Sequence, residues 1–430
     1  MTYHNAIKYI KNAPNVAQKS SCAKERIERL FKMLGDPQKR IKYIRLAGSN
    51  GKSVCAQMMT SILNNANILS GCLTMPLLSE LRENIKIGGA PISMDETVHF
   101  TKLIVKAVTS INEEDKAADP ERKTVFTPTA HEIMLCIAML AFLARGCKLV
   151  FIESEHSADD PSRFLPTPLS AIICGAIPSE DKTEIAKIRS YIQKGLTEIT
   201  SVPQDPDAYR IIASTCHSAN CRLTISMPTN AHVSALNLRG TVFTYKGSEY
   251  KLKICGRFQV TNAILAIESS EMLVRNGFNI SKQNIINGLA NLSLPSKFEI
   301  LSISPTIIVD STHMPIAIET VSDSMAELKK FTGTRVRLCL TDEDLCEQYT
   351  DALLRRGYEI ENIISLPSPD TDDTAAKQTE NITITVCKTP KLAAKAALKD
   401  LEQNSILLIS GRADLAEKIR YELLAILGFR

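Results

Sequence analysis

The sequence contains no tryptophan, and aromatic residues make up only 5% of its 430 positions. Proteins that bind single-stranded nucleic acid stack bases on aromatic side chains, so the composition argues against that class. The formal net charge is only +4 at pH 7. Such a weak charge favours neither nucleic acid nor a membrane surface as a partner. We therefore expect no nucleic-acid partner and no membrane partner.

Long apolar runs and paired cysteine motifs are also missing. No run of 18 apolar residues occurs, so the sequence predicts no membrane-spanning helix. The first residues contain no signal-peptide core. The twelve cysteines include no C-x-x-C pair; Cys216 and Cys221 flank His217, but no second half of a zinc site follows. We interpret the cysteines as reduced thiols of a cytoplasmic protein.

The chain is organised around residues 41–53. An apolar run over 41–46 predicts a buried strand, which breaks at AGSNGKS and is followed by apolar residues at helical spacing. A strand, a glycine-rich turn and a helix form the context of a phosphate-binding loop. Gly48 and Gly51 would let backbone N–H groups turn towards phosphate oxygens. Lys52 would reach the β- and γ-phosphates, and the Ser53 hydroxyl would bind Mg²⁺.

The phosphate-loop pattern is incomplete, because Leu46 stands where its first glycine is expected. The alternative interpretation is a strand-to-helix turn that happens to carry a lysine. The flanking strand and helix favour phosphate binding.

Buried strands alternate with helices through the first part of the chain. This alternation predicts a parallel sheet with right-handed crossovers. Ligands of such sheets bind beyond the carboxyl ends of the strands. Because Glu153 follows one predicted strand, we expect it to converge with Ser53. The further strands expected here are 68–73, 148–152 and 169–174.

Later segments are less regular. A helix is predicted over 184–196, carrying Lys194, and 205–250 is predicted as short β-like runs with turns. A strong helix is expected from residue 255 to 272, and 294–297 looks like a linker. From residue 298 a second series of strands and helices predicts a smaller α/β domain.

Seven segments, in their order along the chain, resemble the folylpolyglutamate synthase and dihydrofolate synthase family of the Mur-type ligases. The resemblance implies an α/β protein with an N-terminal phosphate-loop, ATP-binding domain and a smaller Rossmann-like C-terminal domain, divided as 1–295 and 296–430. The segments are AGSNGKS, TMPLLSELRENIKIGGAPIS, TPTAHEIMLCIAMLAF, FIE, GRFQVTNAILA, PSKFEIL and VDSTHMP.

What the resemblance implies about activity is a carboxylate–amine ligation. A folate or pteroate carboxylate is phosphorylated by ATP to an acyl phosphate, which the amine of glutamate attacks, so that ADP and phosphate leave. ATP and Mg²⁺ are the implied cofactors, and ATP, a folate or pteroate, and glutamate are the implied partners. We further expect a cytoplasmic monomer.

The resemblance also implies roles for individual residues. Lys194 aligns with the family lysine that is carbamylated, and Asp310 and His313 would face the γ-phosphate and the incoming amine. The implied catalytic set is Lys52, Lys194, Asp310 and His313. The implied metal ligands are Ser53 and Glu153. The implied nucleotide contacts are Gly48, Ser49, Asn50, Gly51, Lys52, Ser53, Asn262 and Lys297.

Several positions depart from the family pattern. Met75 replaces a metal-binding serine, and a thioether is a poor ligand for Mg²⁺, which prefers hard oxygen donors. Lys297 replaces an arginine, so a point charge stands in place of a bidentate fork. These departures leave two alternatives to an active folate ligase: a ligase with another acid and amine, and a degenerate fold that binds nucleotide without turnover.

Overall fold

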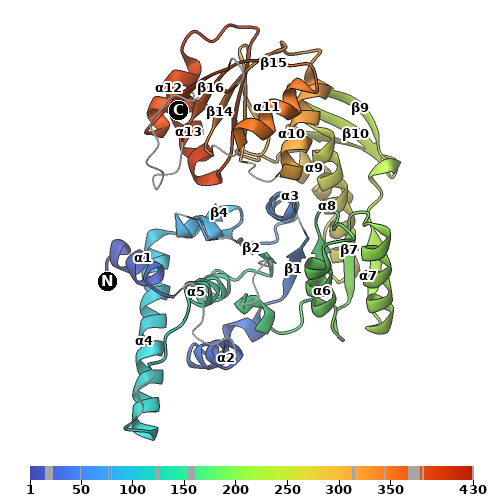
Figure 1. The fold of residues 1–430 in the computed structure, drawn as a ribbon. Coiled ribbons are helices and arrows are strands. Elements are labelled where there is room, and N and C mark those ends of the chain that lie inside the picture. The colour runs from blue at the N-terminus through green and yellow to red at the C-terminus, as the bar shows by residue number, and fades with distance from the viewer. Residues whose placement is uncertain are drawn as a thin grey trace. The chain divides into compact units, whose positions relative to one another are not determined.

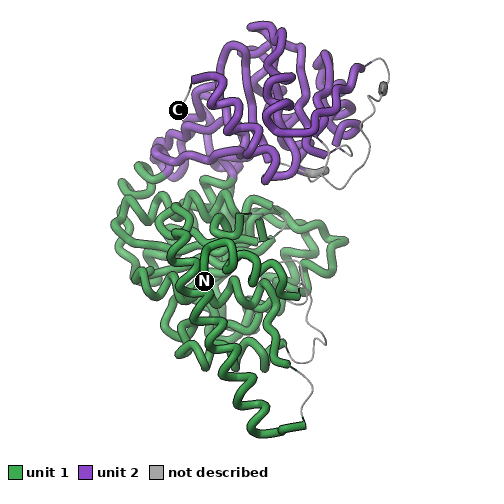
Figure 2. Tube along the Cα trace, turned by 90° about the vertical axis from the view of Figure 1, so that its left-hand side faces the viewer, with its two compact units in different colours: residues 1–227, 262–288 green, residues 228–261, 289–430 purple. Residues whose placement is uncertain are grey.

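The computed structural model describes residues 1–14, 23–48, 50–75, 77–78, 80–121, 125–153, 160–311, 315–342, 345–366, 378–379 and 382–428. The contacts among residues divide the protein into two compact units, coloured separately in Figure 2. Unit 1 comprises Met1–Met227 and Asn262–Gly288, and unit 2 comprises Pro228–Thr261 and Leu289–Arg430. Strands and helices alternate in each (Figure 1), so the predicted α/β fold is confirmed.

Unit 1 is built on an eight-stranded sheet of order β4-β3-β2-β5-β1-β6-β7-β8. Within the run β2-β5-β1-β6-β7-β8 each pair of neighbouring strands is parallel, whereas β3 and β4 form an antiparallel edge next to β2. The central strands β1 and β5 are buried over their whole length because nearly all their residues are apolar. The bounds are β1 Tyr43–Ala47, β2 Ser70–Leu73, β3 Ile85–Ile87, β4 Ala90–Pro91, β5 Leu149–Glu153, β6 Ser170–Ile173, β7 Glu198–Ser201 and β8 Arg222–Ile225.

The strand β1 lies where the chain changes direction across this sheet. From β1 the chain passes to β2 on one side of β1, and from β6 it continues to β7 and β8 on the other side. In open α/β sheets, ligands bind beyond the carboxyl ends of the strands at such a point. The segment that follows Ala47 therefore lies where this architecture favours a ligand.

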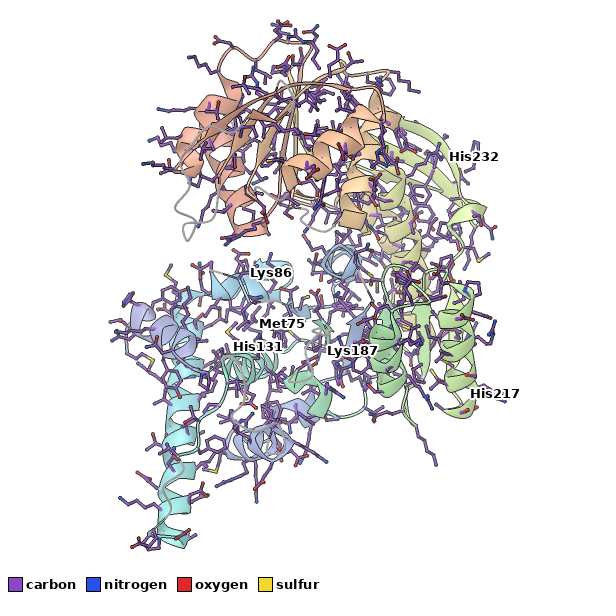
Figure 3. All side chains as sticks on the ribbon, in the orientation of Figure 1. Met75, Lys86, His131, Lys187, His217 and His232 are labelled. Atoms are coloured by element: carbon purple, nitrogen blue, oxygen red, sulfur yellow. The ribbon has the colours of Figure 1, made fainter. Side chains whose placement is uncertain are left out.

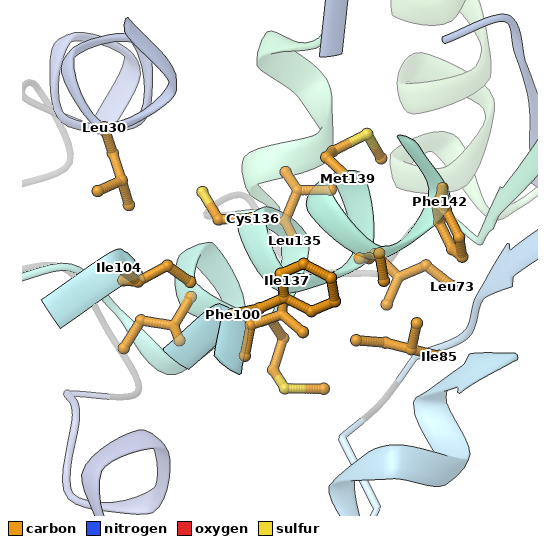
Figure 4. Close-up of a cluster of buried hydrophobic side chains, with 14 of the residues drawn as sticks. Leu30, Leu73, Ile85, Phe100, Ile104, Leu135, Cys136, Ile137, Met139 and Phe142 are labelled. Atoms are coloured by element: carbon orange, nitrogen blue, oxygen red, sulfur yellow. The ribbon is translucent and has the colours of Figure 1, made fainter. Parts of the chain in front are cut away.

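One hydrophobic cluster of unit 1 packs around helix α5. This helix is buried on nearly every side because it is apolar all round. In Figure 4 its side chains pack with Leu73 of β2 and with Phe100 and Ile104 of α4. The helices of this part are α1 Tyr3–Lys11, α2 Ala23–Met33, α3 Lys52–Asn65, α4 Met94–Ala118, α5 Ala130–Ala144, α6 Lys182–Tyr191, α7 Pro206–Ser218, α8 Arg257–Arg275 and α9 Lys282–Ala290.

Unit 2 contains a seven-stranded sheet of order β12-β13-β18-β14-β15-β17-β16 and a three-stranded sheet of order β11-β10-β9. The five central strands of the larger sheet are parallel, and β12 and β16 are antiparallel edges. The strands are β9 His232–Asn237, β10 Gly240–Tyr245, β11 Ser248–Leu252, β12 Glu299–Ile303, β13 Thr306–Asp310, β14 Arg335–Leu340, β15 Glu359–Ser365, β16 Gln378–Thr379, β17 Ile382–Val386 and β18 Ile406–Ser410. The helices are α10 Pro315–Leu328, α11 Leu345–Leu354, α12 Pro390–Leu398 and α13 Ala413–Ile426.

The three-stranded sheet belongs to unit 2 although it precedes α8 in the sequence. Leu238 and Cys255 join the same hydrophobic cluster as Phe298 and Ile308. The expected domain division assigns residues 228–261 to the N-terminal part, whereas their apolar contacts group them with the C-terminal sheet.

Two expectations about local structure are wrong. The helix expected over 184–196 is α6, which ends at Tyr191, because the backbone leaves the helical conformation at Ile192, whose ψ is 87°. The segment expected to be β-like from residue 205 begins with a helix, α7, whose Pro206 occupies the first turn. Among the helices that the structure describes, each is too short or too polar to cross a membrane.

Candidate functional site

The loop between β1 and α3 turns on two glycines. Gly48 has a φ of 103° and Gly51 a φ of 78°, values that favour glycine. A Cβ atom at Gly48 would lie 2.1 Å from the carbonyl oxygen of Cys174, so only glycine can stand there. Gly51 is the N-cap of α3 and has no side chain to bond the first N–H groups of the helix. Such a helix start is well suited to hold an anion.

Lys52 is 8% exposed and folds back over this loop. Its Nζ donates a hydrogen bond to the Gly48 carbonyl oxygen at 2.7 Å and lies 3.8 Å from Oε1 of Glu153. The sheet register explains the second contact, because Leu46 of β1 pairs with Glu153 of β5. The two buried charges are opposite, which offsets part of the cost of burying each.

Two further segments reach the loop. The Oδ1 atom of Asn262, in α8, lies 3.1 Å from the position that a Cβ of Gly51 would take. The backbone N–H of Met75, which follows β2 and is labelled in Figure 3, donates to Oε2 of Glu153 at 3.4 Å. Together these segments place N–H groups, an ammonium and a carboxylate around one glycine loop. Such a set can bind a polyphosphate.

Oxygen donors for a metal ion are few. In the described part of the chain, no group of three or more His, Cys, Asp and Glu side chains could hold a metal ion. Ser53, half-buried in the first turn of α3, and Glu153 supply two oxygen donors near the loop. Mg²⁺ usually takes one or two carboxylates from the protein and keeps phosphate oxygens and water as its other ligands. The donor set therefore fits a Mg²⁺ ion that arrives with a nucleotide.

Lys194 lies away from this loop, so its expected placement is wrong. It is exposed in the turn that precedes β7, at the amino ends of the strands. Its neighbour Gln193 lines a small cavity together with Tyr43, the first residue of β1. The loop leaves the opposite end of this five-residue strand, roughly 13 Å away. The expected position depended on a helix that continued past Tyr191, and α6 ends there.

In unit 2, two of the expected residues lie at the carboxyl end of β13. Asp310 is the last residue of this strand, and its Oδ2 accepts a hydrogen bond from the Phe298 N–H at 2.8 Å. The Nζ of Lys297 donates to Oγ of Ser311 at 2.8 Å. The turn before β12 therefore brings Lys297 beside the residue that follows Asp310.

Two hydroxyl groups lie beside this edge, one from the neighbouring strand β18 and one from helix α11. Ser410 of β18 pairs with Asp310 in the sheet register, and its Oγ shares a 2.6 Å hydrogen bond with the Tyr349 hydroxyl. Burial, and then the charge of Asp310, raises the pKa of Tyr349 well above its usual range. The phenol therefore stays neutral at physiological pH.

Ser49 and His313, both expected in the site, lie outside the described residues. Asn50 is half-buried beside Gly51. Sequence reasoning missed Cys174 as the residue against which Gly48 packs, and it missed the Met75 N–H as a donor to Glu153. Neither contact has a local sequence signal, because the partners come from strands distant in the chain.

Comparison with known proteins bears on whether this loop binds phosphate or is a turn that happens to carry a lysine. No protein-family model matches the chain. The folylpolyglutamate synthase of Lacticaseibacillus casei is 24% identical over 357 residues, which cover 80% of this chain and 81% of that protein. The dihydrofolate synthase/folylpolyglutamate synthase of Bacillus subtilis is 25% identical over 327 residues, covering 72% of this chain and 73% of that one.

These relatives support the resemblance of the chain to the folylpolyglutamate synthase and dihydrofolate synthase family. A solved complex of folylpolyglutamate synthase with AMPPCP and folate agrees in fold, with a TM-score of 0.77 at 20% identity. That similarity covers 99% of this chain and 100% of the solved one. The chain therefore shares the fold of that protein through both of its units.

Proposed function

We propose that this chain is an ATP-dependent ligase that joins the carboxylate of a folate or pteroate to the amine of glutamate. The observation that carries the proposal is the buried Lys52, which lies over the glycine loop between Gly48 and Glu153. The names of the related proteins support the choice of a folate acid and of glutamate. The solved complex with AMPPCP, an ATP analogue, and folate supports ATP as the phosphoryl donor.

Phosphoryl transfer depends on positioning and on charge neutralisation more than on covalent help from the protein. The N–H groups at the start of α3 would bind phosphate oxygens, and Lys52 would turn from the Gly48 carbonyl to the β- and γ-phosphates. The side chain of Asn262, next to Gly51, would contact the nucleotide. Ser53 and Glu153 would hold Mg²⁺, which supplies further neutralisation of phosphate charge when it is bound.

The chemistry proceeds in two balanced steps. An oxygen of the acid's carboxylate attacks the γ-phosphorus of ATP, an acyl phosphate forms and ADP leaves. The nitrogen of glutamate then attacks the acyl carbon, phosphate leaves with the C–O bond electrons, and the nitrogen loses its proton as the amide forms. Lys297, Asp310 and His313 are proposed to contact these reacting groups, and the family resemblance is their support. Lys194 is left out, because it lies at the other end of the strands.

The domain assignment belongs to this proposal as well. We propose that residues 1–295 carry the ATP-binding function and 296–430 the Rossmann-like part of a cytoplasmic monomer. Nucleotide binding without ligation, the competing function, is not favoured, since the related proteins are named as synthases.

A phosphate-release assay tests the proposed function. The purified chain is supplied with ATP, Mg²⁺ and glutamate, and with dihydropteroate or tetrahydrofolate as the acid. We expect release of phosphate that requires both the acid and glutamate, with one amide formed for each phosphate released. ATP binding without such release would favour the competing function.

The Lys52→Ala variant tests the loop itself. Loss of a charge-assisted contact to phosphate costs about 1.5–3 kcal/mol, so the dissociation constant for ATP should rise about tenfold to a hundredfold. Lys24→Ala is the matched control, because Lys24 is an exposed lysine that pairs with Glu28 on the surface of α2. Equal ATP affinity in the two variants would reject the phosphate-loop assignment.

A further inference from the structure

A groove in unit 2 runs along the free edge of strand β12. In the described part of the chain, β12 pairs with β13 alone, so its other edge carries no strand. All five residues of β12, Glu299–Ile303, line the groove. Because successive side chains of a strand point to opposite faces, a cavity lined by five residues in a row lies along the strand edge. Its volume of about 590 Å³ is within the range of small-molecule sites, about 300–1,000 Å³.

The groove is lined mainly by apolar side chains. Those that come from outside β12 are buried and include Leu238, Leu292, Leu294 and Phe298. The residues of β12 itself are half-buried, except for Ile303, which is 47% exposed. A ligand with an apolar body would release water from these side chains, and this release favours binding.

Two basic side chains line the same groove. Arg239 lies in the turn between β9 and β10, and Lys253 directly follows β11. Both side chains are exposed. Within the part of the chain that the structure describes, neither side chain makes a hydrogen bond or an ion pair. Their charges are therefore available to a ligand.

The backbone holds these two cations close to each other. A Cβ atom at Gly240 would lie 2.1 Å from the Leu252 carbonyl oxygen and 3.3 Å from the Cα of Lys253, so the turn packs directly on the end of β11. The Arg239 N–H donates to Oδ1 of Asn237 at 2.8 Å, which fixes the turn. Two neighbouring positive charges without a counter-ion attract an anion.

The carboxylates around the groove are already paired. Glu299, which lines it, accepts a hydrogen bond from Nη2 of Arg420 at 2.7 Å and another from the Ser296 N–H at 2.9 Å. In β11, Glu249 pairs with Lys251 at 3.4 Å. An anion that enters the groove therefore meets two available cations and a carboxylate whose charge is offset.

We propose that this groove binds a small amphipathic anion, with an elongated aliphatic body and a carboxylate or phosphate at one end. The apolar side chains would bury the body, and Arg239 and Lys253 would bind the anionic end. This site goes beyond the proposed ligation, since none of its lining residues belongs to the nucleotide, metal or reacting groups proposed above.

An added β-strand fits this edge less well than a small ligand. The strand β12 has only five residues, and its pairing with β13 shifts between Ile300 and Ser302, so that Leu301 is an extra residue. Such irregularities disrupt the hydrogen-bonded ladder and protect sheet edges from further strands. The geometry therefore favours a small ligand over an extended peptide.

Calorimetry with the purified chain tests the site with octanoate, decanoate and octyl phosphate, and with octanol as the uncharged control. We expect one saturable decanoate site per chain, with a dissociation constant of about 1 mM or lower. Each buried CH₂ group strengthens binding about fourfold, so decanoate should bind about tenfold more tightly than octanoate. Octanoate should bind about tenfold more tightly than octanol. The comparison of octanoate with octyl phosphate identifies the preferred anionic group.

The double variant Arg239→Gln, Lys253→Gln tests the cations. It should bind decanoate about tenfold more weakly and octanol equally well, because two exposed charge contacts are lost. Lys391→Gln with Lys395→Gln is the matched control, since it removes the same charge from exposed positions of α12 outside the groove. Ile303→Asp should abolish decanoate binding, because it puts a negative charge among the apolar side chains. All these positions are exposed, so the variants should fold.

Four results would overturn the proposal. The first is the absence of saturable decanoate binding, and the second is equal decanoate affinity in the double variant and its control. The third is an equal loss in Lys52→Ala, which would place decanoate at the glycine loop. The fourth is a dimer in sedimentation velocity that the double variant abolishes, which would assign the groove to a second copy of the chain. No measurement uses ATP or a folate, so failure here and failure of the proposed function are distinguishable.

Discussion

Replacement of Gly48 by alanine probes the loop through the backbone alone. The substitution removes no charge and no hydrogen-bonding group. The added Cβ atom would lie 2.1 Å from the carbonyl oxygen of Cys174 and 2.9 Å from its carbonyl carbon. Ordinary van der Waals contact begins at 3.4 Å. The loop or the end of β6 must therefore move by more than 1 Å, and neither is a flexible side chain that can turn away.

Two separate costs add to give the expected effect. A side chain at a φ of 103° costs about 1–2 kcal/mol of backbone strain. The clash adds a displacement of the N–H groups that would bind phosphate. Binding sites of this kind tolerate a misplacement of only about 0.5 Å. We therefore expect ATP affinity to fall at least about tenfold, which corresponds to about 1.4 kcal/mol.

Gly35→Ala separates the two costs. Gly35 has a φ of 78°, and an added Cβ would meet no atom within 4 Å. This control carries strain of similar size without a clash, so it should lose a similar amount of stability and no ATP affinity. Calorimetry with ATP and urea denaturation measure the two quantities. A Gly48→Ala variant that folds and binds ATP within about twofold of the wild type would refute the reasoning.

The other predictions concern single side chains. Met75→Ser places an oxygen beside Glu153, whose Oε2 already accepts a hydrogen bond from the N–H of residue 75. The Mg²⁺-dependent ligation rate should be higher in Met75→Ser than in the matched control Met75→Ala, which loses the same apolar contacts. Equal rates in the two variants would count against a metal role for this position. Lys194→Ala should leave ATP affinity unchanged in calorimetry, because this lysine is exposed at the amino ends of the strands; a tenfold loss would restore it to the site. Arg26→Ala leaves the buried carboxylate of Glu132 without its bidentate partner. The free energy of unfolding, measured by urea denaturation, should fall by about 3–5 kcal/mol, and a fall below about 1 kcal/mol would contradict this prediction.

Local sequence signals were sufficient to predict the strands and the helix that meet at the glycine loop. The apolar residues of β1 and β5 predict buried strands because a parallel sheet covered on both faces excludes water from each residue. The two glycines and Lys52 predict the loop because few other residues allow such a turn beside an anion. Since the carboxyl ends of parallel strands share one edge of a sheet, the approach of Glu153 could also be expected.

The predictions made from the sequence were wrong about where two helices begin or end. The helix expected over 184–196 was predicted to carry Lys194, but α6 ends at Tyr191 because Ile192, with a ψ of 87°, leaves the helical conformation. The helix α7 was missed because 205–250 was predicted as short β-like runs with turns, although a proline such as Pro206 is favoured in the first turn of a helix.

The order of chemical groups along the chain was therefore determined by the sequence alone: a strand, a glycine loop with Lys52, a carboxylate at the end of a later strand, and a second series of strands and helices. Only the tertiary structure decided which distant residues complete the loop. Cys174 closes it from behind, Asn262 lies beside Gly51, and the Met75 N–H bonds to Glu153. These contacts depend on strand order and register, which bring together segments that local propensity and spacing cannot pair.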